Sequence, residues 1–219
     1  LINTNFESVN EFTFKINNKL KVENLSINSN ILIDSSQYKR NDLTIKDIVK
    51  INDLIDLKDH KIKASYVNNE LSFKGKGKVK LVDKFDLIDY EVTKKGSDFD
   101  LLSNIELSEI NIKNKNLIKE YLPNTKDTLN LKDHKIKIDY KDDILSLEGS
   151  GKIKLEKAFN KIRYVFSKKN KKYNFETDLE INDTTLKIDF INYEKDKKIN
   201  SQFKIIGSYS KKIGLDLKK

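Results

Sequence analysis

An internal repeat constrains the fold of this chain more than any other feature of its sequence. The heptapeptide LKDHKIK occurs at residues 57–63 and returns unchanged at 131–137, which is 74 positions later. Sliding the sequence by that distance aligns 57–107 with 131–181 without a gap, and about two in five aligned positions are identical. A unit copied head to tail indicates an elongated array, in which each unit contacts its neighbours, rather than a single globule.

The repeat predicts four parts in the 219 residues. Residues 41–113 and 114–185 are each expected to form one unit with a leading connector helix. Residues 1–40 resemble the end of a preceding unit, and 186–219 resemble the start of a following one. The number of units in the full protein is left open.

The two connectors differ from the rest of each unit. Residues 41–53 and 114–127 have helical apolar spacing over a turn or two, and the second connector stops at Pro123, the only proline. The chain starts at Leu1 and contains no methionine, so we expect it to be a fragment or a processed piece. It holds no apolar run long enough to span a bilayer as a helix and no recognisable signal peptide.

Strict two-residue alternation dominates each unit. In LSFKGKGKVKL at 71–81 every second residue is apolar or glycine, and the residues between them are serine and lysine. Segments 67–70 (VNNE) and 94–98 (KKGSD) suit tight hairpin turns. Antiparallel strands with one apolar and one wet face have this pattern. The sequence therefore predicts an all-β fold of repeated antiparallel strands, forming an elongated, curved (U-shaped) β-groove sheet with short connecting helices.

The G-x-G of each unit invites comparison with a phosphate-binding loop. Gly75 and Gly77 lie in phase with the apolar residues of one continuous strand, and Gly149 and Gly151 repeat them. A nucleotide loop needs a strand that ends at the glycines, a helix after them and a third glycine, and none of these follows. Glycines on the inner face of a strand instead relieve crowding where a sheet bends or where something approaches the backbone.

The apolar phase of the two units is predicted to form one uncharged surface, which is the candidate site. An apolar surface of that length must be filled by side chains, by another part of the chain or by apolar ligands. Whether the sheet is an open groove, or a closed sandwich or barrel packed on itself, is left open at this point. The candidate groove residues are Ile62, Ala64, Tyr66, Leu71, Phe73, Gly75, Gly77, Val79, Leu81, Ile136, Ile138, Tyr140, Leu145, Leu147, Gly149, Gly151, Ile153 and Leu155.

Other chemistries are disfavoured. The absence of cysteine excludes disulfides, thiolate zinc sites and cysteine nucleophiles. His60 and His134, the only histidines, occupy equivalent positions without a carboxylate in the same phase, so structural roles are favoured over a metal site. No catalytic constellation is visible. We therefore predict no enzymatic activity, no cofactor and no metal.

The net charge of +9 permits contact with anionic partners, but 34 acidic residues are interleaved with the basic ones. The lysines at 74–80 are not all kept in the second copy, where residue 148 is glutamate. Only two arginines occur and the aromatic residues lie mainly in the apolar phase, so no platform for base stacking is expected. A solvated lysine face that protects the sheet is favoured over nucleic-acid binding.

The unit as a whole resembles a known repeat. LKDHKIKIDYKDDILSLEGSGKIKL at 131–155 carries the resemblance, and the copy at 57–81 supports it. Both are similar to the repeats of the AsmA-like family of Gram-negative envelopes, which includes YhdP and TamB. The resemblance covers the two units well and the ends loosely, and its motif is alternation plus glycines. It implies β-groove units stacked into a long sheet with a hydrophobic interior.

The resemblance also implies a function. Family members are thought to be anchored in the inner membrane by an N-terminal helix, to cross the periplasm and to carry phospholipid toward the outer membrane. On that basis this chain is expected to be a segment of a bridge-like lipid transfer protein. Its partners would be phospholipid or another acyl lipid, with the membrane reached through segments outside this chain. The alternative is a structural or adhesive cell-surface β-repeat stalk whose inner face packs dry against itself.

Overall fold

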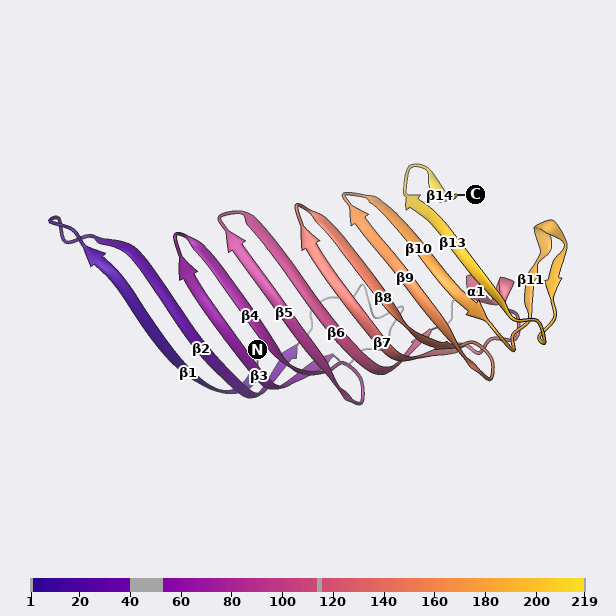
Figure 1. Ribbon diagram of the computed structural model, residues 1–219, viewed down its shortest axis with the longest axis horizontal. Helices are drawn as coiled ribbons and strands as arrows, with labels where there is room; N and C mark the ends of the chain where they lie inside the picture. Colours follow the sequence, from indigo (N-terminus) through magenta and orange to yellow (C-terminus); the bar gives the residue numbers. More distant parts are fainter. Residues whose placement is uncertain (1, 40–52, 114–115, 219) are drawn as a thin grey trace. The chain divides into compact units, whose positions relative to one another are not determined.

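The computed structural model describes residues 2–39, 53–113 and 116–218. Within these residues, twelve strands form one open antiparallel sheet, which confirms the all-β, repeated-strand prediction (Figure 1). Each strand pairs with the next in chain order, except that β10 pairs with β13. The strands are β1 (Ile2–Ile16), β2 (Val22–Lys39), β3 (Leu54–Val67), β4 (Glu70–Lys80), β5 (Phe85–Lys95), β6 (Asp98–Lys113), β7 (Thr128–Lys141), β8 (Ile144–Lys154), β9 (Phe159–Lys169), β10 (Lys172–Ile181), β13 (Ser201–Ser210) and β14 (Gly214–Leu217).

Four short elements lie outside this sheet. They are helix α1 (Asn116–Tyr121), strands β11 (Leu186–Ile188) and β12 (Tyr193–Lys195), which pair with each other, and the 3-10 turn η1 (Asp189–Ile191) between those strands. Helix α1 lies within the connector expected at 114–127 and ends two residues before Pro123. Residues 41–52 of the other expected connector helix lie outside the described residues.

The described residues divide into two compact units. Unit 1 comprises 2–39, 53–105 and 137–145 and therefore holds β1 to β5 complete. Unit 2 comprises 106–113, 116–136 and 146–218 and holds β9 to β14 complete.

Hairpin turns of unit 1 form where the sequence predicts them. Asn68 and Asn69 between β3 and β4 both have positive φ, and so do Asp142 and Asp143 between β7 and β8. Two positive φ values are what a type I′ turn requires, and Asn and Asp tolerate that conformation better than most residues. The hydroxyl of Tyr66 donates to Oδ1 of Asn69 at 2.9 Å and steadies the first of these turns.

A β-bulge interrupts β3 at a position that alternation alone does not reveal. The pairing with β4 shifts between Lys58 and Lys61, and Asp59 has a φ of 56°. Lys78 on β4 donates to the Asp59 carboxylate at 2.9 Å and holds the bulge in place. A bulge adds one residue to one strand and bends it, and the strands of this unit curve along their length (Figure 1).

A closed hydrophobic core occurs in one part of unit 2. Leu129, Ile153, Leu155 and Ile181 on the sheet are covered by Leu122, which follows α1, and by side chains of β11. The β11 residues in this core are Leu186 and Ile188.

A buried lysine ties down the end of the covering hairpin. Lys195, 1% exposed, donates from Nζ to the carbonyl oxygens of Thr184 at 2.9 Å and Asp196 at 3.2 Å, and also to that of Ile199. Saturating the ammonium group with carbonyl oxygens offsets the cost of burying its charge. The hairpin is therefore an integral cover of this part of the sheet.

Candidate apolar binding face

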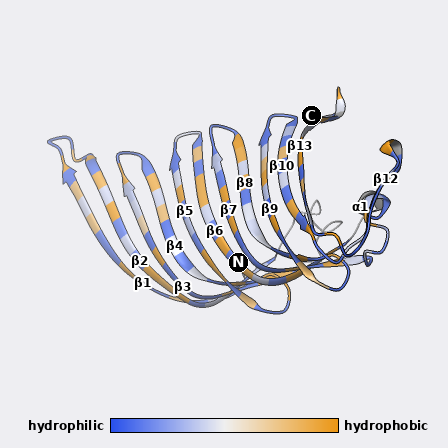
Figure 2. Cartoon of the chain, turned by 45° about the vertical axis from the view of Figure 1, so that its right-hand side comes forward, coloured by the Kyte–Doolittle hydropathy of each residue, from blue (hydrophilic) through white to orange (hydrophobic). Residues whose placement is uncertain are grey.

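The strand register places the predicted groove residues of the first copy on one face of unit 1. Ile62 pairs with Gly75, and Ala64 pairs with Phe73. Residues directly opposite each other in antiparallel strands project to the same face. The same face continues onto β5, where Phe73 pairs with Val92. Figure 2 shows the resulting alternation of hydrophobic and hydrophilic residues along the strands.

This apolar face of unit 1 extends across β2 and β1, which the sequence analysis left out of the site. Ile31 pairs with Ile62, and Ile27 pairs with both Tyr66 on β3 and Phe12 on β1. Isoleucines at 27, 31 and 33 share one phase and carry the signal that would have identified β2. The β1 contribution is harder to recognise, because Asn10 and Ser8 share the face with the phenylalanines.

Unit 2 has an equivalent apolar face that the sequence analysis also missed. Phe166 pairs with Phe175, and Phe175 pairs with Gly207 on β13. Next to them, Leu179 pairs with both Ile162 and Phe203. The face carries no charge until Lys168 and the hairpin tip are reached.

The predicted residues of the second copy lie on β7 and β8 in the expected alternation, except Leu155, which directly follows β8. Those in unit 2 are Ile136, Leu147, Gly149, Gly151, Ile153 and Leu155, and those in unit 1 are Ile138, Tyr140 and Leu145. Most of the predicted face is partly exposed, which distinguishes it from a packed interior. The exceptions among the larger side chains are Val79, which is 5% exposed, and Ile153 and Leu155, which are buried in the closed core.

The repeated glycines make room for two rings. A Cβ added at Gly77 would lie 2.4 Å from the His60 ring, and one added at Gly75 would lie 2.5 Å from Cζ of Tyr90. The second copy has the same arrangement, with His134 over Gly151 and Tyr164 over Gly149. Each glycine is thus required by the close approach of a side chain to the strand backbone, the second of the two explanations offered by the sequence.

Both histidines have structural bonding. Nε2 of His134 lies 3.0 Å from the Lys152 carbonyl oxygen, and Nδ1 lies 3.2 Å from the Tyr164 hydroxyl. The carbonyl can only accept, so Nε2 carries the proton, and the tyrosine then donates to Nδ1. His60 repeats these contacts with the Lys78 carbonyl at 3.0 Å and Tyr90 at 3.4 Å. Both ring nitrogens have protein partners in each copy.

Burial determines the protonation states of His134 and Tyr164. Desolvation lowers the pKa of His134 below its ordinary value, against smaller opposing effects of the Lys152 carbonyl and the Asp133 charge. Desolvation also raises the pKa of Tyr164 and of Tyr90. A neutral imidazole facing a neutral phenol is the form that this environment favours.

Away from the hairpin tips, Asp86 breaks the predicted absence of charge on the apolar face. Asp86 on β5 pairs with Val79 and is buried, although the phase should be apolar. Its counterpart in the repeat is Asn160, whose Oδ1 accepts from the backbone N–H of Asn182 at 2.7 Å. Both copies therefore have a buried polar side chain near the start of β5 or β9, but only the aspartate of the first copy can be charged.

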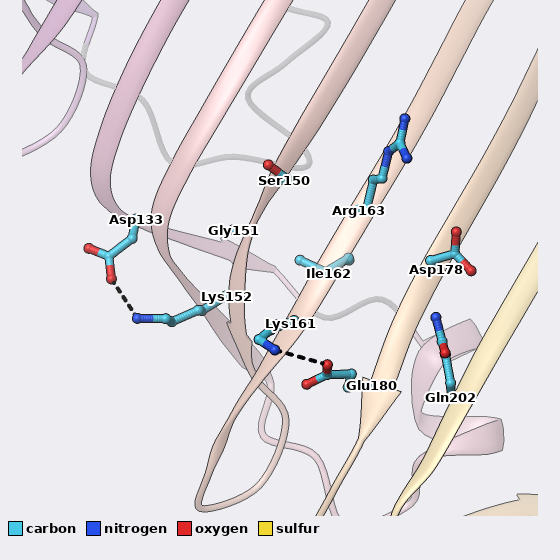
Figure 3. A pocket seen from close by; sticks show the side chains of 10 residues that line it. All are labelled: Asp133, Ser150, Gly151, Lys152, Lys161, Ile162, Arg163, Asp178, Glu180 and Gln202. Atoms are coloured by element: carbon cyan, nitrogen blue, oxygen red, sulfur yellow. Dashed lines mark hydrogen bonds and ion pairs between the residues drawn. The ribbon is translucent and has the colours of Figure 1, made fainter.

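The opposite face of unit 2 is hydrophilic and internally paired. A pocket of about 500 Å³ lies there. Lys152 pairs with Asp133 at 3.1 Å and Lys161 with Glu180 at 3.4 Å in its lining (Figure 3). Arg163 in the same pocket pairs with Glu148 at 2.9 Å. Paired charges of this kind are typical of a solvated sheet face. They offer few free cations for a polyanion.

The described residues contain neither a metal-binding cluster nor a membrane-spanning helix. No group of three or more histidine, aspartate or glutamate side chains within 2–39, 53–113 and 116–218 could hold a metal ion. No helix in this part of the chain has the length and apolar content needed to cross a membrane.

The chain was also compared with known proteins. No family model, curated protein or solved structure matches it.

Proposed function

We propose that the apolar face binds the acyl chains of phospholipid, and that this chain is a non-enzymatic segment of a bridge-like lipid transfer protein of the bacterial envelope. The resemblance of the repeats to the AsmA-like family supports the setting, in which phospholipid crosses the periplasm toward the outer membrane. The proposal that the chain binds lipid is based on the partly exposed apolar residues of the sheet.

One observation carries the proposal. In each unit, register-matched apolar residues cover several adjacent strands and remain partly exposed, as Phe73 beside Ala64 and Val92 does in unit 1. Apolar surface of this extent on a soluble sheet normally marks a ligand or partner. An acyl chain suits it, because each methylene removed from water contributes about 0.8 kcal/mol.

The ends of the face suit an amphipathic ligand. Lys94 follows Val92 on the apolar phase of β5, and Lys168 occupies the same place at the end of β9. Both side chains lie where the strands reach their hairpin turns. A lipid whose acyl chain lies along the strand would place its phosphate near such a lysine. Binding and release of this kind need no catalytic group.

Lipid occupancy tests the proposal. The 219-residue chain would be purified without detergent, and bound lipid would be extracted and identified by mass spectrometry. We expect phospholipid in the wild type and its loss in the double variant Phe73→Lys/Leu147→Lys, because each substitution places a charge on the apolar face.

The control is matched by position. Ser72→Lys/Ser146→Lys adds the same two charges to the same two strands, one residue away and on the opposite face. We expect this variant to keep its lipid. Far-ultraviolet circular dichroism would confirm that both variants are folded. A folded wild type without lipid, or equal loss in both variants, would remove the basis of the proposal.

A second candidate is the structural β-repeat stalk. The closed core of unit 2 favours it, because Leu155 and Ile153 are buried together with Leu122 and with Leu186 and Ile188 of β11 rather than left for a ligand. A stalk would have its remaining apolar face covered in the assembled protein. It predicts a folded wild type with no lipid bound.

A further inference from the structure

Two neighbouring hairpin tips of unit 2 concentrate lysine. The turn between β9 and β10 and the turn between β13 and β14 are adjacent, because Lys172 pairs with both Lys169 and Ser210 (Figure 1). We name the lysines at these two tips the basic rim. Its members are Lys168, Lys169, Lys171, Lys172, Lys211 and Lys212.

The basic rim lacks the compensation found elsewhere in the chain. Segments 166–174 and 208–214 contain no aspartate or glutamate, and all six lysines are exposed. Several lysines elsewhere pair with carboxylates, as Lys204 does with Glu176 at 2.7 Å. Within the described residues none of the six forms an ion pair. Lys168 alone has a contact, with its Nζ 5.7 Å from the centre of the Tyr173 ring.

Apolar and aromatic side chains accompany this charge. Ile213, in the second turn, is 77% exposed, and Tyr209, near the end of β13 before that turn, is 44% exposed. The Tyr209 ring lies 6.2 Å from that of Tyr173, which in turn contacts Phe166 at 5.8 Å. Lysines around an exposed isoleucine and tyrosines match the chemistry of a membrane interface, where phosphates meet the ends of acyl chains.

We propose that the basic rim docks onto the surface of an anionic bilayer. The lysines contact lipid phosphates, while Ile213 and Tyr209 enter the interfacial layer. This inference goes beyond the proposed function, because docking needs only the two hairpin tips and does not require lipid on the apolar face. A bilayer is favoured over a nucleic acid because a polyanion in water gives Ile213 no partner.

The experiment is vesicle co-sedimentation of the 219-residue chain. The vesicles are phosphatidylcholine alone, or phosphatidylcholine with about one third phosphatidylglycerol. We expect wild-type protein to partition onto the anionic vesicles on the order of a hundredfold more strongly. The variant Lys169→Gln/Lys171→Gln/Lys172→Gln/Lys211→Gln should lose binding by a similar factor, and Ile213→Ser should lose roughly tenfold.

A charge-matched control distinguishes docking by the rim from attraction by net charge. Lys61→Gln/Lys63→Gln/Lys76→Gln/Lys137→Gln removes the same four charges from exposed positions on other strands. We expect it to bind within about threefold of wild type, since charges away from the contact are screened. Circular dichroism confirms folding of every variant.

Three results would overturn the inference. The first is wild-type protein that does not distinguish anionic from neutral vesicles. The second is equal loss of binding in the two four-lysine variants, which would mean that net charge alone attracts the chain. The third is unchanged vesicle binding by Ile213→Ser together with equally lysine-dependent binding to duplex DNA, which would identify a general polyanion contact.

Discussion

The two copies of the repeat, 57–107 and 131–181, agree in the contacts of their buried histidines and differ in their surface charges. Each copy has a histidine over one glycine and a tyrosine over the other, with the same two hydrogen bonds to the histidine ring. In contrast, Lys74 pairs with Glu91, whereas Glu148 at the position equivalent to Lys74 pairs with Arg163. The sign of the charge is reversed, and a partner of opposite charge has moved to a neighbouring position.

This difference shows which positions the fold constrains. A ring in contact with backbone leaves no alternative to glycine, and a buried imidazole needs both of its partners. An exposed ion pair needs only charge complementarity, which several arrangements on a sheet face can supply. The bulge position is conserved between the copies although it is exposed: Asp59 and Asp133 both have positive φ, and each pairs with a lysine.

The copies also differ in how their apolar face ends. Leu155 is 1% exposed beneath the covering hairpin, whereas its counterpart Leu81 is partly exposed. Leu129 is fully buried, and the equivalent Ile55 is not. The two copies have the same apolar alternation in their sequences, but equivalent residues are buried to different extents.

The largest effect is expected at the glycines. Gly151→Ala and Gly77→Ala should each lower the free energy of unfolding by about 3 kcal/mol, because the new methyl group would displace a histidine ring held by two hydrogen bonds. Urea denaturation followed by circular dichroism measures this. Similar costs in both copies would confirm that the two sites are equivalent.

A double-variant cycle identifies the cause of that cost. In a His134→Ala background, Gly151→Ala should cost less than about 1 kcal/mol, because the obstructing ring is gone. An undiminished cost would show that the histidine ring is not what requires the glycine.

The next effect compares the loss of a leucine side chain at the buried end of the face, at Leu155, with its loss at the partly exposed end, at Leu81. Leu155→Ala should destabilise the protein by about 3 kcal/mol through the cavity it leaves, and Leu81→Ala by about 1 kcal/mol. The same denaturation experiment measures both. Equal losses would contradict the difference in burial between the copies.

A smaller effect is expected from pH. The folded pKa of His134 lies below the unfolded value near 6.5, so the folded state binds fewer protons between these two values. The neutral His134 ring therefore contributes fully to the free energy of unfolding above about pH 6.5. This contribution is lost as the pH falls through the lowered pKa. Thermal denaturation between about pH 7 and pH 5 should show this loss. The variant His134→Gln should be less stable at neutral pH but should change less over the same interval.

The smallest effect concerns the reversed ion pairs. Lys74→Glu should cost at most about 1 kcal/mol, since both partners are substantially exposed, and Lys74→Glu/Glu91→Lys should restore most of the loss. Thermal denaturation at low and high salt measures the difference. A loss that persists unchanged at high salt would argue against an electrostatic origin.

Much of the local structure follows from the sequence. Period-two alternation predicted the strands, and the register of β3, β4 and β5 agrees with it in the first copy, where Ala64 and Phe73 lie opposite each other. Asn-Asn and Lys-Lys-Gly-Ser-Asp predicted turns that the structure contains. The histidines were expected to be structural, and their bonding agrees with that expectation. These features depend on neighbours along the chain or on the fixed two-residue period of a strand, so a single sequence contains them.

Which apolar residues are buried was decided by the tertiary structure. Residues 57–107 and 131–181 carry the same alternation, yet Leu155 is buried by Leu122 and Ile188, which lie far from it in sequence. The bulge at Asp59 and the partnership of Gly77 with His60 likewise depend on strand pairing. Alternation is a local property that assigns each side chain to a face, whereas burial depends on which distant segment packs against that face.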